Sequence, residues 1–339
     1  MTESRPHLAG LIEDRWNLGL ADVLVRRGWR HRVLAHTGYG NGEMVRVLAR
    51  VILAPPTYDP KAGDALLQRR GWRNFVTAEA LDTPVTVTVA GEQHEVRTDR
   101  SGNVDARLPN PGLAPGWAEV TLQAADSPPA TARVRVIGDD VEAGIVSDID
   151  DTVLSTYLPR PLLAAYNTFV AREEARRPVR GMSELYDRIL ADRPGAPIVY
   201  VSTGAWNTAP TLRRFLSRNG LPDGPLLLTD WGPTNTGWFR SGPQHKRACL
   251  ESLAADFPRI RWVLVGDDGQ HDPAIYADFA RTHPEHVRAI AIRELPMTEQ
   301  VLAHGTPGAR AGGEASQLDV TQVRGPDGDA IAPLLLGAL

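Results

Sequence analysis

The chain has 339 residues, of which 42% are hydrophobic, and its formal net charge is −4 at pH 7. A chain of this length can bury a large core and is expected to form two domains, and its negative charge argues against general binding of nucleic acid. The single cysteine, Cys249, excludes an intramolecular disulfide framework, and no zinc-site spacing is present.

The termini and the apolar runs indicate a protein without a membrane anchor. The first residues lack the basic-then-apolar pattern of a signal peptide. No apolar run is long enough to cross a bilayer. We therefore expect a cytoplasmic protein, and the sequence leaves open whether it also contacts membranes peripherally.

The N-terminal part begins with an expected helix. Apolar residues recur near helical spacing from Ile12 to Arg27. The next segment, Arg26–Arg32, is basic and contains one tryptophan. It is either a contact with an anionic membrane or, as we favour, a solvated helix end whose arginines complement the helix dipole.

Alternating apolar residues then predict short strands. A short helix is expected at Asp64–Phe75. The expected strands are Met44–Leu53, Val85–Val89, His94–Arg97, Glu119–Gln123 and Ala132–Ile137. Short strands at this spacing predict a small antiparallel β-sandwich from about Met44 to Ile137.

After Gly144, apolar runs without strict alternation are separated by helical patterns, as in strands that are buried on both faces of a parallel sheet. The first expected strand begins at Ile145, and the others are Pro197–Val201, Leu226–Thr229, Trp262–Val265 and Ala289–Ile292. The expected helices are Met182–Leu190, Pro210–Arg218, His245–Asp256 and Pro273–Thr282. This order predicts an α/β domain with a doubly wound, mostly parallel sheet. The tail after Met297 is expected to be poorly ordered as far as Pro333.

Acidic residues follow the first strand of this domain in the stretch Ile145–Thr156. Asp148 and Asp150 are two residues apart, so in an extended segment they point the same way. Such crowding is costly without a cation such as Mg²⁺. Beside a cation, one carboxylate can attack phosphorus while the other transfers protons. A solvated acidic turn is the alternative for an isolated Asp-x-Asp.

Three more strand ends carry polar groups. Ser202, Thr203 and Gly204 follow the second strand, where a hydroxyl and backbone N–H groups could hold phosphate oxygens, although Ser-Thr-Gly is also an ordinary turn. Lys246 lies near the start of a helix, where it opposes the helix dipole and therefore indicates a nearby anion. An ordinary surface lysine is the alternative.

The strand that ends at Val265 is followed by Gly266 and a run of acids that includes Asp267, Asp268 and Asp272. Carboxylates crowded at a buried strand end would repel each other. A divalent metal that joins this turn to Asp148 would remove the repulsion.

Taken together, these motifs resemble those of the haloacid dehalogenase superfamily of phosphohydrolases. The first motif is matched by Asp148, Asp150 and Thr152, the second by Ser202, the third by Lys246, and the fourth by Gly266, Asp267 and Asp272. The local sequences Ser147–Thr152, Gln244–Arg247 and Val265–Pro273 resemble one branch, the actin-patch phosphatidate phosphatase family and its bacterial relatives. A departure from that pattern is Thr203-Gly204-Ala205, which is smaller than expected after the second motif.

The resemblance implies a role for each matched residue. Asp148 would be the nucleophile and Asp150 the acid and base, with Thr152 orienting Asp150 or its turn. Ser202, Thr203, Gly204 and Lys246 would bind the phosphoryl oxygens. The ligands of Mg²⁺ would be Asp148, the carbonyl group of Asp150, and Asp267. Asp268 and Asp272 would lie next to these ligands without binding the metal.

The residue patterns, together with a resemblance that covers the C-terminal half well and the N-terminal part only loosely, predict an organisation for the chain. Residues 1–140 would form a helix plus a β-sandwich, residues 141–300 a haloacid dehalogenase-like phosphatase domain, and residues 301–339 a tail. Tyr157–Arg180 is long enough for a small cap, whose arginines would meet an anionic head group or simply face solvent.

The expected function is Mg²⁺-dependent hydrolysis of a phosphomonoester through an aspartyl-phosphate. The favoured substrate is phosphatidate or a related lipid phosphate at a membrane surface. The alternatives are a phosphatase for soluble small molecules and an inactive relative that binds lipid or protein. The complete set of acids and lysine argues against the inactive relative, and protein partners cannot be inferred.

Overall fold

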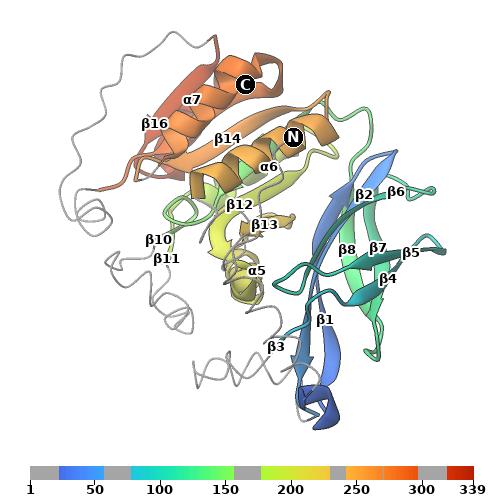
Figure 1. The fold of residues 1–339 in the computed structure, drawn as a ribbon. Coiled ribbons are helices and arrows are strands. Elements are labelled where there is room, and N and C mark those ends of the chain that lie inside the picture. The colour runs from blue at the N-terminus through green and yellow to red at the C-terminus, as the bar shows by residue number, and fades with distance from the viewer. Residues whose placement is uncertain (1–22, 57–77, 156–176, 230–241, 270, 297–318) are drawn as a thin grey trace, which may run out of the picture. The chain divides into compact units, whose positions relative to one another are not determined.

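The computed structural model describes residues 23–56, 78–155, 177–229, 242–269, 271–296 and 319–339 (Figure 1). The chain divides into two compact units. The first comprises residues 1–138 and 229–241, and the second comprises residues 139–228 and 242–339. Each unit has its own sheet. The finer division into segments 1–140, 141–300 and 301–339 stays a prediction.

The first unit contains a mixed sheet of eight strands. Its strands are β1 (Arg30–Gly40), β2 (Met44–Ala54), β3 (Ala78–Glu79), β4 (Pro84–Val89), β5 (Glu92–Arg97), β6 (Asn103–Pro109), β7 (Gly116–Ala124) and β8 (Ala130–Val136). Their order is β3-β2-β1-β8-β7-β4-β5, and β6 also pairs with β2. Strand β1 is antiparallel to β2 and parallel to β8, which makes the sheet mixed.

The core of this unit is built from alternating apolar residues. Val45 and Val47 of β2 lie in the same buried cluster as Val85, Val87 and Val89 of β4. Side chains two residues apart on a strand share one face. The sheet curls into a half-barrel, because β5, at one end of the strand order, contacts β6, which pairs with β2 near the other end.

The fold class predicted from the sequence is therefore wrong. The structure has a strand-rich mixed half-barrel and a separate parallel sheet, not a haloacid dehalogenase-like doubly wound domain preceded by an antiparallel β-sandwich. The main error was β1, which the sequence analysis did not predict. This strand hydrogen-bonds to both β2 and β8, so strands that were expected to form two packed layers form one continuous sheet.

The basic segment Arg26–Arg32 matches its favoured interpretation as a solvated helix end only in its first residues: residues 23–26 are helical, and Arg26 and Arg27 are exposed where this helix ends. Arg30 and His31 begin β1. Both pair with Asp126, with Arg30 Nη1 at 2.8 Å and His31 Nδ1 at 2.7 Å from its carboxylate oxygens. Part of the charge in this segment is thus compensated within the unit.

The second unit contains a six-stranded sheet in the order β13-β12-β9-β14-β15-β16. The strands are β9 (Ala143–Asp148), β12 (Ile198–Ala205), β13 (Leu226–Thr229), β14 (Arg261–Asp267), β15 (Val287–Arg293) and β16 (Thr321–Gly325). The helices are α4 (Met182–Ala191), α5 (Ala209–Arg218), α6 (Gly242–Asp256), α7 (Asp272–Thr282) and α9 (Gly328–Leu336). The pairing is parallel from β12 through β9, β14 and β15 to β16.

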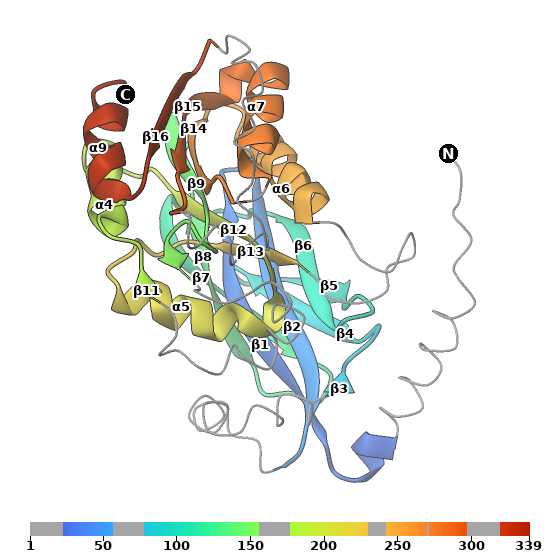
Figure 2. The same ribbon diagram turned by 90° about the vertical axis from the view of Figure 1, so that its left-hand side faces the viewer.

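Helices lie on both faces of this sheet, with α6 and α7 on one side and α4 and α9 on the other (Figure 2). All six residues of β9 are buried as a result. This double burial explains the apolar runs without alternation in the sequence. The strands and helices expected between Ile145 and Ile292 are present, with ends that differ by a few residues.

The C-terminal segment was not predicted correctly. It was expected to be poorly ordered as far as Pro333, but β16 extends the parallel sheet and α9 follows it. Ile331 and Leu335 of α9 are fully buried, and Asp327 caps the helix by accepting a hydrogen bond of 3.0 Å from Ala330 N. The helix is short and mostly apolar, so it lacks the polar face that reveals a helix in a sequence.

Several expectations fall outside the described residues. These are most of the helix at Ile12–Arg27, the helix at Asp64–Phe75, and most of the cap at Tyr157–Arg180. A short antiparallel pair, β10 (Leu154–Ser155) and β11 (Arg177–Pro178), joins the two ends of that cap segment. None of the helices in the part of the chain that the structure describes is long and apolar enough to cross a membrane.

Candidate active site

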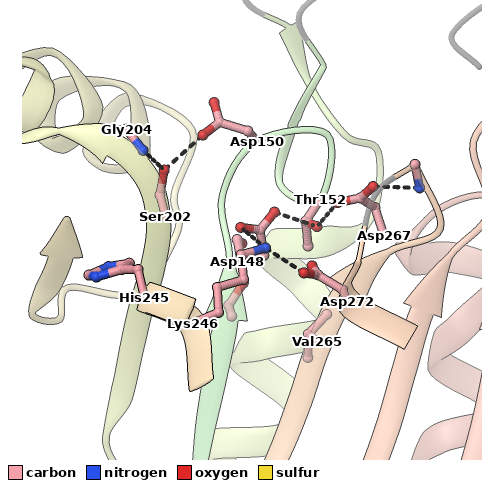
Figure 3. Close-up of polar contacts among 12 residues, drawn as sticks. Asp148, Asp150, Thr152, Ser202, Gly204, His245, Lys246, Val265, Asp267 and Asp272 are labelled. Atoms are coloured by element: carbon pink, nitrogen blue, oxygen red, sulfur yellow. Dashed lines mark hydrogen bonds and ion pairs between the residues drawn. The ribbon is translucent and has the colours of Figure 1, made fainter. Parts of the chain in front are cut away.

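The candidate residues meet at the carboxyl ends of the parallel strands in the second unit (Figure 3). Asp148 is the last residue of β9, and Asp267 is the last residue of β14, which pairs with β9. Ser202 lies in β12 on the other side of β9. Parallel strands present their carboxyl ends at the same edge, where ligands of such sheets bind.

Lys246 of α6 is the cation of the site. Its Nζ lies 2.8 Å from Asp148 Oδ1 and 2.5 Å from Asp272 Oδ1. All three residues are buried, with exposed fractions of 7% for Lys246, 3% for Asp148 and 1% for Asp272. This ammonium group therefore does not belong to a surface lysine; it joins the end of β9 to the start of α7.

Thr152 and Asp267 complete this cluster. The Thr152 hydroxyl oxygen lies 3.1 Å from Asp148 Oδ2 and 3.4 Å from Asp267 Oδ2. A hydroxyl group has one proton, so it can donate to only one of these carboxylates at a time. Asp267 Oδ1 also accepts a hydrogen bond of 2.7 Å from Gly269 N.

The acidic residues form a group suited to a metal ion. Asp148, Asp267 and Asp272 are buried, and each offers a carboxylate oxygen within 4.8 Å of the others. Three carboxylates and the Lys246 ammonium have a formal charge of −2, which a divalent cation would neutralise. Asp272 Oδ2 is buried and has no hydrogen-bond partner among the described residues. Hard oxygen donors of this kind suit Mg²⁺.

Burial is the largest influence on the pKa values of Asp148 and Asp267. It raises the pKa of Asp148 to about 7, although the attraction of Lys246 opposes the rise. Burial, together with repulsion by Asp272 and Asp148, also raises the pKa of Asp267 well above its usual value. Burial disfavours the charged form of Lys246, but the neighbouring carboxylates outweigh that effect and raise its pKa. The lysine thus stays charged while the carboxylates repel each other.

Asp150 lies apart from the acidic cluster and points toward Ser202. Ser202 Oγ donates a hydrogen bond of 2.8 Å to Asp150 Oδ2 and accepts one of 2.9 Å from Gly204 N. Thr203 and Gly204 still belong to β12 rather than to a following turn. The single hydroxyl proton of Ser202 is directed at Asp150, so a bound phosphate would have to take it over.

Asp268 is oriented away from this cluster. Its Oδ1 accepts a hydrogen bond of 2.8 Å from Leu295 N, just beyond the end of β15.

Gly266 leaves space for the carboxylate of Asp272. A Cβ atom at this position would lie 2.5 Å from Asp272 Oδ2, so only glycine leaves room for that carboxylate.

Arg293 is a residue of this region that the sequence analysis did not single out. It is the last residue of β15 and is 5% exposed. Its guanidinium group donates to the carbonyl oxygen of Asp151, the residue between Asp150 and Thr152. The available sequence signal was an arginine directly after an otherwise apolar strand.

Comparisons with known proteins agree with the motifs. Residues 143–294 match the family model described as the catalytic domain of phosphatidate phosphatase APP1. Phosphatidate phosphatase APP1 of Saccharomyces cerevisiae is 28% identical over 151 residues, which are 44% of this chain and 25% of that protein. An uncharacterized protein of Schizosaccharomyces pombe is 29% identical over 160 residues, with the same shares of the two chains.

The chain thus spans about a quarter of the length of these curated relatives. Among solved structures, a carbohydrate acetylesterase from Xanthomonas citri shares 11% identity and covers 78% of this chain and 70% of its own, but its TM-score of 0.26 is too low to carry an argument. Every candidate site residue from Asp148 to Asp272 lies inside the segment that matches the family. The family resemblance expected from the motifs is confirmed there: residues 143–294 are similar to the catalytic domain of phosphatidate phosphatase APP1.

Proposed function

We propose that the chain is a Mg²⁺-dependent phosphomonoester hydrolase that acts on phosphatidate or a related lipid phosphate through an aspartyl-phosphate. The observation that carries this proposal is the buried cluster of Asp148, Lys246, Asp267 and Asp272. Burying three carboxylates around one ammonium group costs stability. Such a cost is typical of sites that bind charged ligands.

In the proposed reaction, a carboxylate oxygen of Asp148 attacks phosphorus, and the bond from phosphorus to the leaving alkoxide breaks. Asp150 gives its proton to that alkoxide. Water then attacks the aspartyl-phosphate and loses a proton to Asp150, which releases phosphate and restores the Asp148 carboxylate. Asp150 is suited to the proton transfers because it is partly exposed and its carboxylate points toward Ser202, not toward Lys246.

Ser202 and Lys246 would bind the oxygens of the transferring phosphoryl group. Ser202 can do so when its proton turns from Asp150 Oδ2 to the substrate. That change ends this contact of Asp150 Oδ2, so that Asp150 can face the leaving oxygen of the substrate.

Asp148, Asp267 and the carbonyl group of Asp150 would hold the Mg²⁺ ion. When bound, the ion would supply positive charge that offsets the negative charge of the phosphate group. Asp272, at 2.5 Å from Lys246 Nζ, holds the lysine.

The lipid substrate is proposed from the family match and from the printed name of the yeast relative. Most of the cap lies outside the described residues. Arg180, one of the arginines expected to meet a head group, instead pairs with Asp329 at 2.6 Å. The remaining question is whether lipid or soluble phosphate esters are preferred.

The test is phosphate release from phosphatidate in mixed micelles and from soluble sugar and nucleotide phosphates, each with Mg²⁺ and with a chelator. The proposal expects activity that depends on Mg²⁺, is highest with phosphatidate and is lost in Asp148→Asn. Asp278→Asn is the matched control, because Asp278 is an exposed residue of the same unit whose carboxylate pairs with Arg247. Preference for a soluble ester would identify a small-molecule phosphatase, and full activity in the chelator would reject the metal.

A further inference from the structure

Arg293 connects two segments that are far apart in the sequence. Its Nη1 donates a hydrogen bond of 2.7 Å to the carbonyl oxygen of Asp151, in the turn after β9. Its Nε donates one of 3.1 Å to the carbonyl oxygen of Pro326, in the loop after β16. Because β14 lies between β9 and β15 in the sheet, the side chain spans the carboxyl end of β14, where Asp267 stands.

The turn that receives this contact is tight. The amides of Thr152, Val153 and Leu154 all lie within 3.3 Å of the Ile149 carbonyl oxygen. Asp151 has φ = 58°, in the left-handed region that an aspartate rarely adopts. The Asp151 carbonyl group lies in one rigid peptide plane with the Thr152 amide, so its displacement would move Thr152 directly. It would also disturb the tight turn that carries Asp150, because that turn is closed by hydrogen bonds from Thr152, Val153 and Leu154 to the Ile149 carbonyl oxygen.

The other end of the contact belongs to residues 319–339, which lie outside the segment that matches the family. This C-terminal segment is firmly attached to the second unit. The Glu294 amide donates to Gly325 O at 2.8 Å, and the Gly328 amide donates to Arg180 O at 2.9 Å. At Gly181, a Cβ atom would lie 2.4 Å from the backbone nitrogen of Asp329, so α9 begins directly against the chain there.

We propose that Arg293 is a positioning residue that holds the Asp150–Thr152 turn against the C-terminal segment, so that residues 319–339 form part of the catalytic unit. Burying a guanidinium group to bind carbonyl oxygens is costly. The function of this costly contact would be to fix the turn that carries the proton donor. The inference rests on the proposed function, because the value of a fixed turn lies in the placement of Asp150.

A structural cross-link without a role in turnover is the competing explanation, and the chain offers a matched control for it. Arg288 lies on the same strand, and its guanidinium group also donates to an oxygen in the C-terminal segment, that of Leu339, the last residue of the sequence. Arg288 stands near the start of β15, whereas Arg293 ends the strand. Arg288→Ala therefore removes a similar cross-link away from the Asp151 turn.

The experiment compares Arg293→Ala, Arg293→Lys and Arg288→Ala with the unaltered protein, at a temperature where circular dichroism shows each to be folded. We expect Arg293→Ala to lower kcat by roughly 10–100-fold with KM within about threefold. Guanidinium at millimolar concentration should restore part of kcat, whereas sodium chloride should not. The kcat of Arg293→Lys should fall between these values, because lysine keeps the charge but lacks the two separately placed donors, Nε and Nη1, that Arg293 uses. Arg288→Ala should keep kcat within about twofold.

Hydrogen exchange provides a readout that does not depend on activity. Amides of residues 149–155 should exchange faster in Arg293→Ala than in the unaltered protein, and Arg288→Ala should leave them unchanged. Unchanged exchange in Arg293→Ala, an unaltered kcat, or an equal loss of kcat in Arg288→Ala would overturn the inference. If the unaltered protein hydrolyses no phosphomonoester, the proposed function fails and the exchange result alone decides whether Arg293 holds the turn. If Arg293→Ala does not fold, Arg293→Lys is judged by the same measurements.

Discussion

Asp148→Asn is expected to stabilise the metal-free protein while abolishing turnover. An isolated aspartate has a pKa near 3.8, whereas burial raises the pKa of folded Asp148 to about 7. Between these two values the folded state holds a proton that the unfolded chain has lost, so stability falls as pH rises through this window. At pH 8 the accumulated cost is about 4 kcal/mol.

Asparagine does not ionise, and its amide oxygen can still accept a hydrogen bond from Lys246. We therefore expect the free energy of unfolding of Asp148→Asn, relative to the unaltered protein, to increase by about 2–3 kcal/mol between pH 5 and pH 8. The assay is urea unfolding at several pH values in the presence of a chelator. Asp278→Asn, which changes an exposed carboxylate, should shift stability by at most about 0.5 kcal/mol.

In the presence of Mg²⁺, the unaltered protein should become more stable than Asp148→Asn. A ligand that binds only the folded state stabilises it, so Mg²⁺ at pH 8 should raise the stability of the unaltered protein much more than that of Asp148→Asn. The reasoning is refuted if the metal-free variant is less stable than the unaltered protein at pH 8. It is also refuted if the difference between the two does not change with pH.

Three further substitutions test the other parts of the site. Asp150→Asn should slow phosphate release by ~10²–10⁴-fold while Mg²⁺ still raises the melting temperature; an unchanged rate would show that another group transfers the proton. Lys246→Met should lower the free energy of unfolding by about 3–5 kcal/mol in urea titrations at pH 7, because Asp148 and Asp272 lose their cation; a neutral effect would show that this ion pair does not stabilise the fold. Gly266→Ala should cost about 1–3 kcal/mol and weaken stabilisation by Mg²⁺, since the new Cβ would meet Asp272 Oδ2 at 2.5 Å; normal Mg²⁺ binding would show that this carboxylate is free to move.

The sequence was sufficient to predict which residues come together in the site, because the parallel sheet is buried on both faces. Its strands appear as apolar runs, and each run ends where a polar residue such as Asp148 or Asp267 begins. Parallel strands place these ends at one edge, so spacing alone predicted that the residues would meet. The directions of the side chains were not accessible. Nothing in the sequence shows that Asp150 turns to Ser202 or that Asp268 turns to Leu295.

The first unit was harder to predict because alternation reveals which face of a strand is buried but not which strand is its neighbour. Strand β2 was recognised from its valines, whereas β1 was not, because its first half carries Arg30, His31 and Arg32. Strand β16 has one buried apolar residue with polar neighbours, Val323, and depends on pairing with β15. Such elements are stabilised by tertiary pairing more than by a pattern of their own.

The most direct test of the account is to trap the intermediate. The protein is mixed with Mg²⁺ and a substrate that it hydrolyses, quenched in acid during turnover, digested and analysed by mass spectrometry. The account predicts a phosphoryl group on the peptide that contains Asp148, sensitive to hydroxylamine as an acyl-phosphate is, and absent from Asp148→Asn. Turnover with the phosphoryl group on a different residue, or turnover that continues in Asp148→Asn, would contradict it.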